Sequence, residues 1–358
     1  MMAERLLMDR YHLYPEVWFH LGGYRAFQFQ GRIYILIPMK DVHGNGLPKK
    51  QEIATFLTAQ GVNGIAHVQP TNDGDLTVRS EEEEFCLLVM PSLKGNGETK
   101  GAQLPNLKVA NELAFFHQGG KLYVQNHEQP FDLPWKSYWI RRLEQMENWY
   151  LHLREQSNPS EMDQLVLLTY PYVMGVSENA IQCIQDCLLD HGKESINQGM
   201  TTTHWRFHEQ TWFIVQQHWM FYKLTTDFSV DHFTRDLSEW IRDHWEKNAW
   251  EKDKWNVVQS FLSDYQQIQP LAMLDWKLLL ARLMFPVSFF QCVETYYESK
   301  DEGKRELMKK RLLHWITTSK ERENRIGELL QMGEQFVNFP LSFPYWVKTS
   351  LNQTSLFR

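Results

Sequence analysis

The sequence predicts an α+β protein with two lobes, a small one built on an antiparallel sheet with one helix and a larger, mainly helical one. Short apolar segments between turn residues fill the first part of the chain, whereas apolar residues at helical spacing dominate the remainder. A stretch rich in Pro, Gly, Ser, Asn and Lys, from Met90 to Leu104, separates the two patterns. We therefore expect a small lobe at 1–91, a helical lobe at 92–335 and an irregular aromatic tail at 336–358.

The small lobe is predicted to hold a hairpin, one helix and three further strands. Ala26–Phe29 and Arg32–Ile37 flank a Gln30-Gly31 turn, which is typical of a β-hairpin. Apolar residues of the segment 51–57 fall on one helical face, and Gly61 follows where a helix would stop. The further strand-like segments are Ala66–Gln69, Leu76–Val78 and Phe85–Val89.

Helical spacing of apolar residues predicts most of the larger lobe. The predicted helices are Leu107–His117, Tyr138–Arg154, Asn179–Leu189, Leu237–Trp245, Trp255–Tyr265, Met273–Phe285 and Arg305–Met332. The stretch Trp205–Asp227 breaks this pattern with aromatic alternation, and we expect a small hairpin or a loop layer there.

Charge and composition exclude several classes of protein. The 44 Asp and Glu residues outnumber 37 Lys and Arg, so the net charge is -7 and nucleic-acid binding is not expected. No window approaches the roughly 18 apolar residues of a membrane-spanning helix, and the N-terminus lacks the apolar stretch of a signal peptide. The sequence therefore predicts synthesis in the cytosol without export or membrane insertion. The four cysteines are expected to be reduced packing residues.

Two segments in the middle of the chain carry the functional signal. Residues 203–212 read THWRFHEQTW, and residues 227–237 read DFSVDHFTRDL. Their order and spacing resemble the aminoglycoside and choline phosphotransferase branch of kinases, in which a His-Gly-Asp-x-x-x-x-Asn loop precedes a metal-binding Asp followed by Phe or Trp. The resemblance implies a two-lobed protein-kinase-like fold, with magnesium and nucleotide as the cofactors of an active member.

The residues at the positions of this motif do not suit phosphoryl transfer. Arg206 stands where the family has its catalytic Asp, and Thr211 where it has the metal-binding Asn. Because a guanidinium carries only donors and stays protonated, Arg206 cannot accept the proton of an attacking hydroxyl. Asp227 remains as a vestigial candidate metal ligand, with Asp231 as a weaker one. We expect Arg206 and Asp227 to pair across an empty site.

Three further polar residues lie near these positions. His204 matches the first His of the family motif, which implies that it holds the loop in shape. His208 is either a leftover polar contact or a base in a different reaction. Asp236 is expected to cap the helix that begins near Leu237, because an Asp side chain accepts bonds from free N–H groups at a helix start.

Few residues of the predicted site could bind the phosphates of a nucleotide. The family grips the phosphates with a Lys on the third strand of its small lobe, but the corresponding segment, Ile33–Pro38, contains none. Lys40 lies just beyond this segment and is a weak candidate for the role. Glu52 occupies the helix position from which the family's Glu would pair with that Lys, although a solvated surface position is the simpler interpretation.

A narrower family is indicated by two more segments. Residues 113–120 (LAFFHQGG) and 133–147 (LPWKSYWIRRLEQME), taken with the two segments above, resemble the CotS-related spore coat proteins over roughly Asp9 to Phe336. The resemblance implies an endospore-forming, Bacillus-type bacterium, synthesis in the mother cell, assembly into the spore coat, and other coat proteins as partners.

Two hypotheses about function follow. The favoured one is a catalytically degenerate kinase-like protein that acts as a structural or interaction component of the coat and needs no cofactor. The alternative is an active phosphotransferase of small molecules or sugars, which would use ATP and Mg²⁺ with Asp227 as the metal ligand and His208 or Asp231 as the base.

Overall fold

The computed structural model describes residues 2–80, 83–91, 108–127, 133–208, 210–214, 220–247, 252–344, 346 and 347. The chain forms two compact units. The first unit consists of Met1–Pro130, Met200–Asp243 and Asn256–Pro270, and the second of Phe131–Gly199, His244–Trp255 and Leu271–Arg358. The predicted α+β class is confirmed: a curled sheet lies in the first unit, and helices make up most of the remaining described chain.

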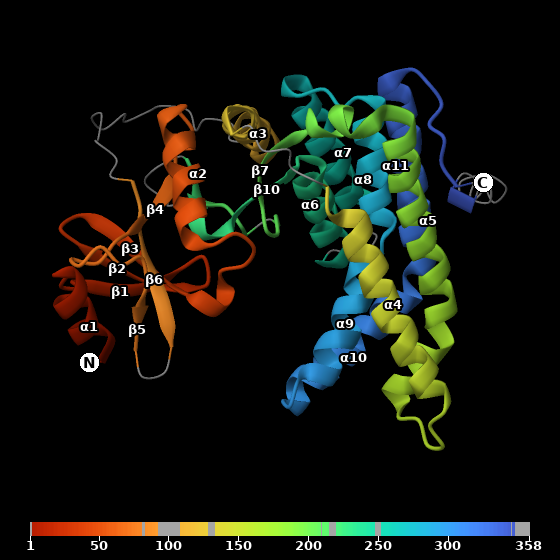
Figure 1. Cartoon of the computed structure of the whole chain (residues 1–358), viewed down its shortest axis with the longest axis horizontal. Helices are drawn as coiled ribbons and strands as arrows, with labels where there is room; N and C mark the ends of the chain where they lie inside the picture. The colour runs from red at the N-terminus through yellow and green to blue at the C-terminus, as the bar shows by residue number, and fades with distance from the viewer. Residues whose placement is uncertain are drawn as a thin grey trace. The chain divides into compact units, whose positions relative to one another are not determined.

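The first unit is organised by one large sheet (Figure 1). Its described strands are β1 (Val17–Leu21), β2 (Tyr24–Phe29), β3 (Arg32–Pro38), β4 (Ile65–Gln69), β5 (Val78–Arg79), β6 (Glu84–Val89), β8 (Phe213–Ile214) and β9 (Phe221–Leu224). Their order is β1-β2-β3-β6-β4-β9-β8, with β5 paired to β6. The predicted hairpin is confirmed, because β2 and β3 pair antiparallel with Phe29 opposite Arg32.

The sheet is extended by a segment from the middle of the chain. The predicted hairpin within 205–227 is formed by β8 and β9, in which Phe213 lies opposite Tyr222. Strand β9 then pairs with β4 in parallel, although the small lobe was expected to be wholly antiparallel. A sequence pattern cannot reveal this parallel pair, since its two strands are far apart along the chain.

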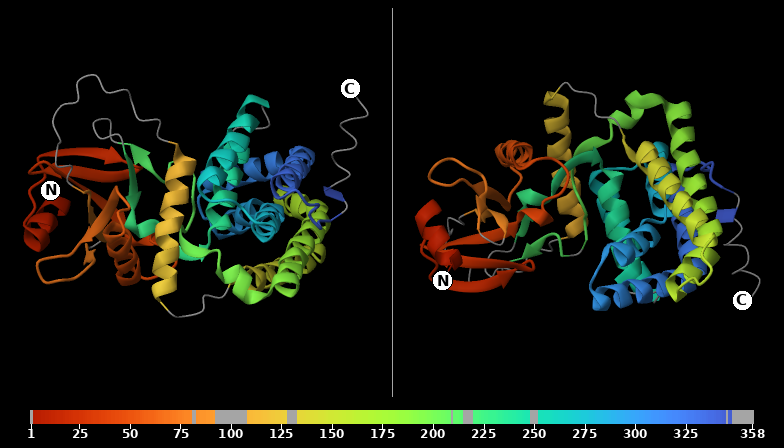
Figure 2. Two further views of the ribbon diagram at one scale, coloured as in Figure 1. Left: turned by 90° about the horizontal axis from the view of Figure 1, so that it is seen from above. Right: turned by 60° about the horizontal axis from the view of Figure 1, so that its bottom comes forward.

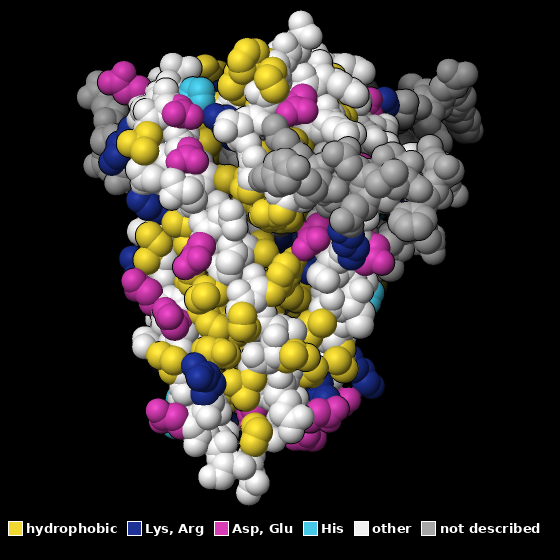
Figure 3. Space-filling model, turned by 90° about the vertical axis from the view of Figure 1, so that its right-hand side faces the viewer, with side chains coloured by type: hydrophobic (Ala, Val, Ile, Leu, Met, Phe, Trp, Pro, Cys, Tyr) yellow, Lys and Arg dark blue, Asp and Glu magenta, His cyan; other side chains and the backbone are white. Residues whose placement is uncertain are grey.

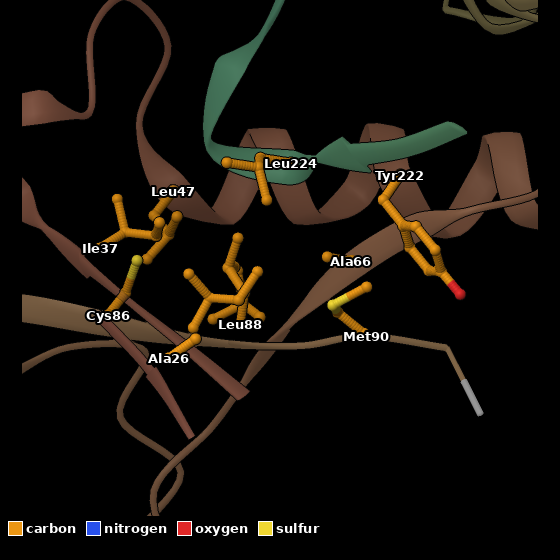
Figure 4. Close-up of a cluster of buried hydrophobic side chains, with 11 residues drawn as sticks. Ala26, Ile37, Leu47, Ala66, Cys86, Leu88, Met90, Tyr222 and Leu224 are labelled. Atoms are coloured by element: carbon orange, nitrogen blue, oxygen red, sulfur yellow. The ribbon is translucent and has the colours of Figure 1, made fainter. Parts of the chain in front are cut away.

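Alternation along β3 supplies both faces of the sheet with apolar side chains. Ile35 and Ile37 join a buried cluster with Leu88 of β6 and Leu224 of β9 (Figure 4). On the opposite face, a second cluster includes residues of β3 together with α1 (Met2–Tyr11). Neither α1 nor β1 was predicted from the sequence, because the first 21 residues show no sustained apolar period.

The remaining regular elements of the site region are four longer helices, two short 3-10 turns and a small sheet. They are α2 (Leu47–Ala59), α3 (Val109–Asn126), α6 (Thr234–Lys247), α7 (Lys252–Ile268), η1 (Met39–Asp41), η2 (Thr225–Asp227), β7 (Met200–His204) and β10 (Phe228–His232). Strands β7 and β10, which pair antiparallel, were not predicted. Helix α3 packs along β7 (Figure 2).

The described part of the second unit is helical. Its long helices are α4 (Trp135–Arg154), α5 (Glu161–Asn197), α8 (Met273–Met284), α9 (Val287–Glu298), α10 (Glu302–Thr317) and α11 (Ser319–Val337). The predicted helix Asn179–Leu189 is only part of α5, which begins at a capping box formed by Ser160 and Asp163. The predicted helix Arg305–Met332 is two helices that meet at Thr318. Most of the predicted tail at 336–358 lies outside the described residues.

One stretch is apolar enough to cross a membrane by length and composition alone. Met273–Glu298, which covers α8 and α9, has a mean hydropathy of 1.3 over its best window. Of that window, 72% is buried inside the protein, and Phe285 and Pro286 separate its two helices. Packing within the second unit therefore accounts for the apolar character of this stretch.

Candidate functional site

The site is framed by the β7–β10 pair. Thr201 lies opposite Asp231 and His204 opposite Phe228, so the ends of the two strands face each other. Just beyond the pair, the Trp205 N–H donates to the Asp227 carbonyl at 2.7 Å. This pairing brings the loop after β7 next to Asp227, and it places both predicted functional segments in one region of the first unit.

A buried polar network fixes the start of the loop. The Asp236 carboxylate on α6 accepts hydrogen bonds from the His204 ring (2.7 Å), the His204 backbone N–H (3.0 Å) and the His117 ring (3.1 Å). The remaining His204 nitrogen accepts from the Trp212 indole at 3.0 Å, so its ring nitrogens are both engaged. Asp236, His204 and His117 are all fully buried. His204 thus ties the loop to α6, and Asp236 serves this network rather than the helix cap expected from the sequence.

The network sets the ionisation of its members. Burial alone would raise the pKa of the Asp236 carboxyl, but the interactions with His204 and His117 outweigh burial and lower that pKa well below its usual range. Burial lowers the pKa of His117 despite the opposing carboxylate. Asp236 is therefore an ionised acceptor that is committed to structure and has no capacity left for chemistry.

The loop itself is held by bonds among its own residues. The Thr211 hydroxyl accepts from the His208 N–H at 2.9 Å and donates to the Arg206 carbonyl at 3.3 Å. The His208 ring accepts from the Gln210 N–H at 3.2 Å. Arg206 is exposed. The Thr211 hydroxyl, which was predicted to stand at the family's metal-binding position, thus shapes the loop.

A lysine that the sequence analysis did not single out lies beside Asp227. Lys50 on α2 is fully buried, and its ammonium donates to the Phe228 carbonyl, one residue beyond Asp227. Burial raises the pKa of Asp227 to about 6, while the Lys50 ammonium acts in the opposite sense. Burial lowers the pKa of Lys50 to about 8, while Asp227 acts in the opposite sense and Arg235 adds to the lowering.

The sequence did contain a signal for Lys50. Lys50, Ile53, Ala54 and Leu57 are spaced as i, i+3, i+4 and i+7, and all four are buried on α2. A lysine inside an apolar helical stripe points toward the core, where it needs a partner. The neighbouring Lys49 instead lies 40% exposed and pairs with Glu52.

The expected pair between Arg206 and Asp227 is not found in the structure. The cation that acts on Asp227 is the Lys50 ammonium. Arg206 follows Trp205 on the exposed side of the loop, whereas Lys50 reaches Phe228 from the buried face of α2. The cation beside Asp227 is therefore supplied by α2 and not by the loop.

The two residues suggested for the nucleotide side point elsewhere. Lys40 is 72% exposed and forms an ion pair with Glu83 at 2.5 Å. Glu52 accepts from Lys49 at 2.9 Å and from the Tyr123 hydroxyl at 2.8 Å, and it lies 2.6 Å from the His127 ring. The structure does not bring Lys40 and Glu52 together, and their contacts are with residues away from Asp227.

Asp231 is committed to a second anchor of the loop. Its carboxylate accepts from the Arg235 guanidinium and from the His232 N–H, each at 2.7 Å, and its side chain is 3% exposed. Arg235 also donates to the Trp205 carbonyl at 2.7 Å and lies over the Trp205 ring. The Asp231 carboxylate thus positions a guanidinium that holds the loop backbone.

These residues do not fit magnesium and a nucleoside triphosphate. Magnesium needs several oxygen ligands, usually including carboxylates. Asp227 has a lysine ammonium as its neighbour, while the oxygens of Thr211 and Asp231 are bonded within the protein. In the part of the chain that the structure describes, no group of three or more His, Cys, Asp or Glu residues is placed to hold a metal ion.

A separate cavity of about 640 Å³ lies in the same unit, among α3, the turn after α2 and the start of β9. Lys223 lines it with only 1% of its side chain exposed. The ammonium donates to the Asn63 carbonyl at 3.1 Å, lies 3.7 Å from the Glu112 carboxylate and sits over the Trp212 ring. Burial lowers the pKa of Lys223 to about 8, although Glu112 opposes the shift.

This lysine predicts a pH dependence of stability. The pKa of Lys223 is lower in the folded state than in the unfolded state, so unfolding takes up a proton between about pH 8 and 10.5, and the lysine's contribution to stability is lost as the pH falls through this window. We expect the unfolding free energy of wild type minus that of Lys223→Met to rise by ~1–3 kcal/mol from pH 7 to pH 10. Chemical denaturation measures this difference, for which exposed Lys320→Met is the control. A flat difference would contradict the prediction.

Comparison with known sequences identifies related proteins. The family model described as "Spore coat putative kinase YutH" matches residues 4–329. The chain is 28% identical over 307 residues to the endospore coat-associated protein YutH of Bacillus subtilis (strain 168), which covers 85% of this chain and 86% of that protein. Both agree with the CotS-related resemblance of the sequence segments.

Solved structures show the same fold. The aminoglycoside phosphotransferase of Alicyclobacillus acidocaldarius superposes with a TM-score of 0.66 at 14% identity, covering 92% of this chain and 96% of that one. A spectinomycin phosphotransferase, solved with ADP and spectinomycin, gives a TM-score of 0.58 at 13% identity and covers 93% of this chain and 98% of its own. The chain therefore has the kinase-like phosphotransferase fold.

Proposed function

Because the chain belongs to the YutH family of spore coat proteins, we propose that it is a catalytically degenerate kinase-like component of the spore coat that acts through contacts with other coat proteins. It would be made in the mother-cell cytoplasm without a signal peptide and then join the coat. The fold of a phosphotransferase provides the scaffold for this role and does not by itself carry an activity.

The observation that carries the proposal is the chemistry of the loop after β7. Phosphoryl transfer requires an acceptor that orients the attacking hydroxyl and oxygen ligands for the metal ion. Arg206, at the position of the family's catalytic Asp, offers only hydrogen-bond donors, and the Thr211 hydroxyl is bonded within the loop. The ammonium of Lys50 beside Asp227 further disfavours a divalent cation.

Exposed apolar side chains of the second unit support a role in protein contacts. On α5, Leu168 and Leu189 are 79% and 73% exposed, and Phe336 and Phe339 near the end of α11 are 50% and 56% exposed. Figure 3 shows hydrophobic side chains gathered between charged ones on one face of the molecule. Apolar groups that gather on a surface are typical of protein interaction sites.

The geometry disfavours the alternative of a phosphotransferase with an altered base. Asp231 is buried against Arg235, so its carboxylate has no open path to a substrate hydroxyl. His208, the second suggested base, is partly buried, and one of its ring nitrogens accepts from Gln210. A base must reach the proton that it removes, and neither residue is arranged to do so.

A nucleotide titration tests the proposal. We expect no change in melting temperature with Mg²⁺ and ATP, whereas a ligand at 100 times its Kd would stabilise the fold by about 2.7 kcal/mol. Radiolabelled ATP with alcohol and sugar acceptors should give no product above background. Transfer of phosphate that is lost in Asp227→Ala would overturn the proposal and establish the phosphotransferase. A melting shift without transfer would leave the chain non-catalytic but would show that it binds nucleotide.

A further inference from the structure

Burial of the Lys50 ammonium costs free energy unless other groups compensate its charge. A fully buried ammonium loses its hydration, and proteins tolerate this only where a counter-charge or several acceptors replace the water. The ammonium donates to the Phe228 carbonyl, and Asp227 is the acidic group that interacts with it. Helix α2 packs directly against η2 and β10, which carry Asp227 and Phe228.

The surroundings of Asp227 differ from those of the other acidic residues of the region. Asp231 and Asp236 each accept hydrogen bonds from basic side chains, whereas none of the hydrogen bonds among the described residues ends on the Asp227 carboxylate. The cation that acts through space on this partly buried group is the Lys50 ammonium.

We propose that the Lys50 ammonium is a built-in cation that neutralises Asp227 and keeps divalent metal ions off its carboxylate. The ammonium places a positive charge near Asp227 and occupies the carbonyl oxygen of the next residue, Phe228, which is thereby engaged as an acceptor. The inference deepens the proposed function, since it gives a physical cause for the loss of metal-dependent chemistry.

Two features of the geometry indicate that the Lys50 ammonium stays beside Asp227. Lys50 lies one helical turn inside α2, where Leu47, Ile53 and Ala54 are buried around it, so its stem is packed on several sides. The Asp227 carbonyl is fixed by the Trp205 N–H, which holds the 227–228 segment in place. The stem of Lys50 and the backbone next to Asp227 are therefore both held in place.

Mn²⁺ binding to the full chain tests the inference, because the loss of the free-ion EPR signal reports the bound ion directly. Lys50→Met keeps the length of the side chain but removes its charge. We expect this variant to bind Mn²⁺ at least about tenfold more tightly than wild type, and the gain to vanish in Lys50→Met/Asp227→Asn. Lys49→Met, which removes the exposed neighbouring lysine, is the matched control and should bind like wild type.

Equal Mn²⁺ affinity of Lys50→Met and wild type would overturn the inference. Should Lys50→Met fail to fold, Lys50→Gln and the wild-type comparison with Asp227→Asn remain. In that comparison we expect Asp227→Asn and wild type to have the same Mn²⁺ affinity, because Asp227 of wild type does not bind the ion. A tenfold weaker affinity of Asp227→Asn would show that Asp227 binds Mn²⁺ in wild type and would overturn the inference. The proposed function is judged separately by phosphate transfer, so an inert protein that binds Mn²⁺ at Asp227 would refute the inference alone.

Discussion

Asp236→Ala is expected to destabilise the protein by ~3–5 kcal/mol at pH 7, because it removes the ionised acceptor at the centre of a buried hydrogen-bond network. The change removes the acceptor of three hydrogen bonds, two from His204 and one from His117, in a fully buried region. Each donor left without a partner costs ~1–3 kcal/mol, because no water can replace the carboxylate. Urea unfolding followed by far-UV circular dichroism and tryptophan fluorescence measures the loss.

An exposed aspartate provides the control for this prediction. Asp73 is 66% exposed and pairs with Arg10 at 3.2 Å, so Asp73→Ala should cost less than ~1 kcal/mol.

The network around Asp236 also predicts that stability is sensitive to acid. The pKa of Asp236 is lowered in the fold, so its stabilising contribution is present above about pH 4 and is lost as the pH falls further. Comparable losses in the two variants would show that the network does not hold the loop.

Gly120→Ala is expected to cost ~3 kcal/mol or more, although alanine favours a helix over glycine. A Cβ at this position of α3 would lie 2.4 Å from the Thr201 hydroxyl and 2.5 Å from the Thr202 backbone nitrogen on β7. The backbone of β7 cannot retreat freely, because the Thr201 hydroxyl donates to the His117 carbonyl at 2.6 Å. Thermal and urea unfolding measure the effect.

The preceding residue is a matched control in the same helix. A Cβ on Gly119 would meet only side-chain methyl groups, that of Val62 at 3.0 Å and that of Leu57 at 3.3 Å, and no backbone atom of a strand. We expect Gly119→Ala to change stability by less than ~1 kcal/mol. If both substitutions were equally mild, the close approach of α3 and β7 would not be the reason for a glycine at position 120.

The parts of the fold that could be predicted are those with a local pattern. The β2–β3 hairpin was predictable because alternation and the turn lie within Ala26–Ile37, and α2 because its apolar stripe repeats over two turns. Helix α1 and strand β7 were not, since Met2–Tyr11 lacks a clear apolar stripe and Met200–His204, with three threonines in a row, lacks the alternation of apolar and polar residues. Their places come from the partners that they pack against.

The candidate site divides in the same way. The order of His204, Arg206, Thr211 and Asp227 in the sequence was enough to locate the loop and to predict that a cation stands where the family has its acceptor. It was not enough to show how Asp227 is neutralised. The Arg206 pair suggested from the sequence is replaced in the structure by Lys50.

The sequence by itself determined that Arg206 cannot accept a proton, because a guanidinium has no acceptor wherever it is placed. Only the tertiary structure decided which cation stands beside Asp227. Lys50 and Phe228 are separated by 178 positions, and they meet because the apolar stripe of α2 packs against η2 and β10 and carries the lysine inside with it. Which residues meet in the buried interior depends on how distant elements pack, and a local sequence pattern does not contain that information.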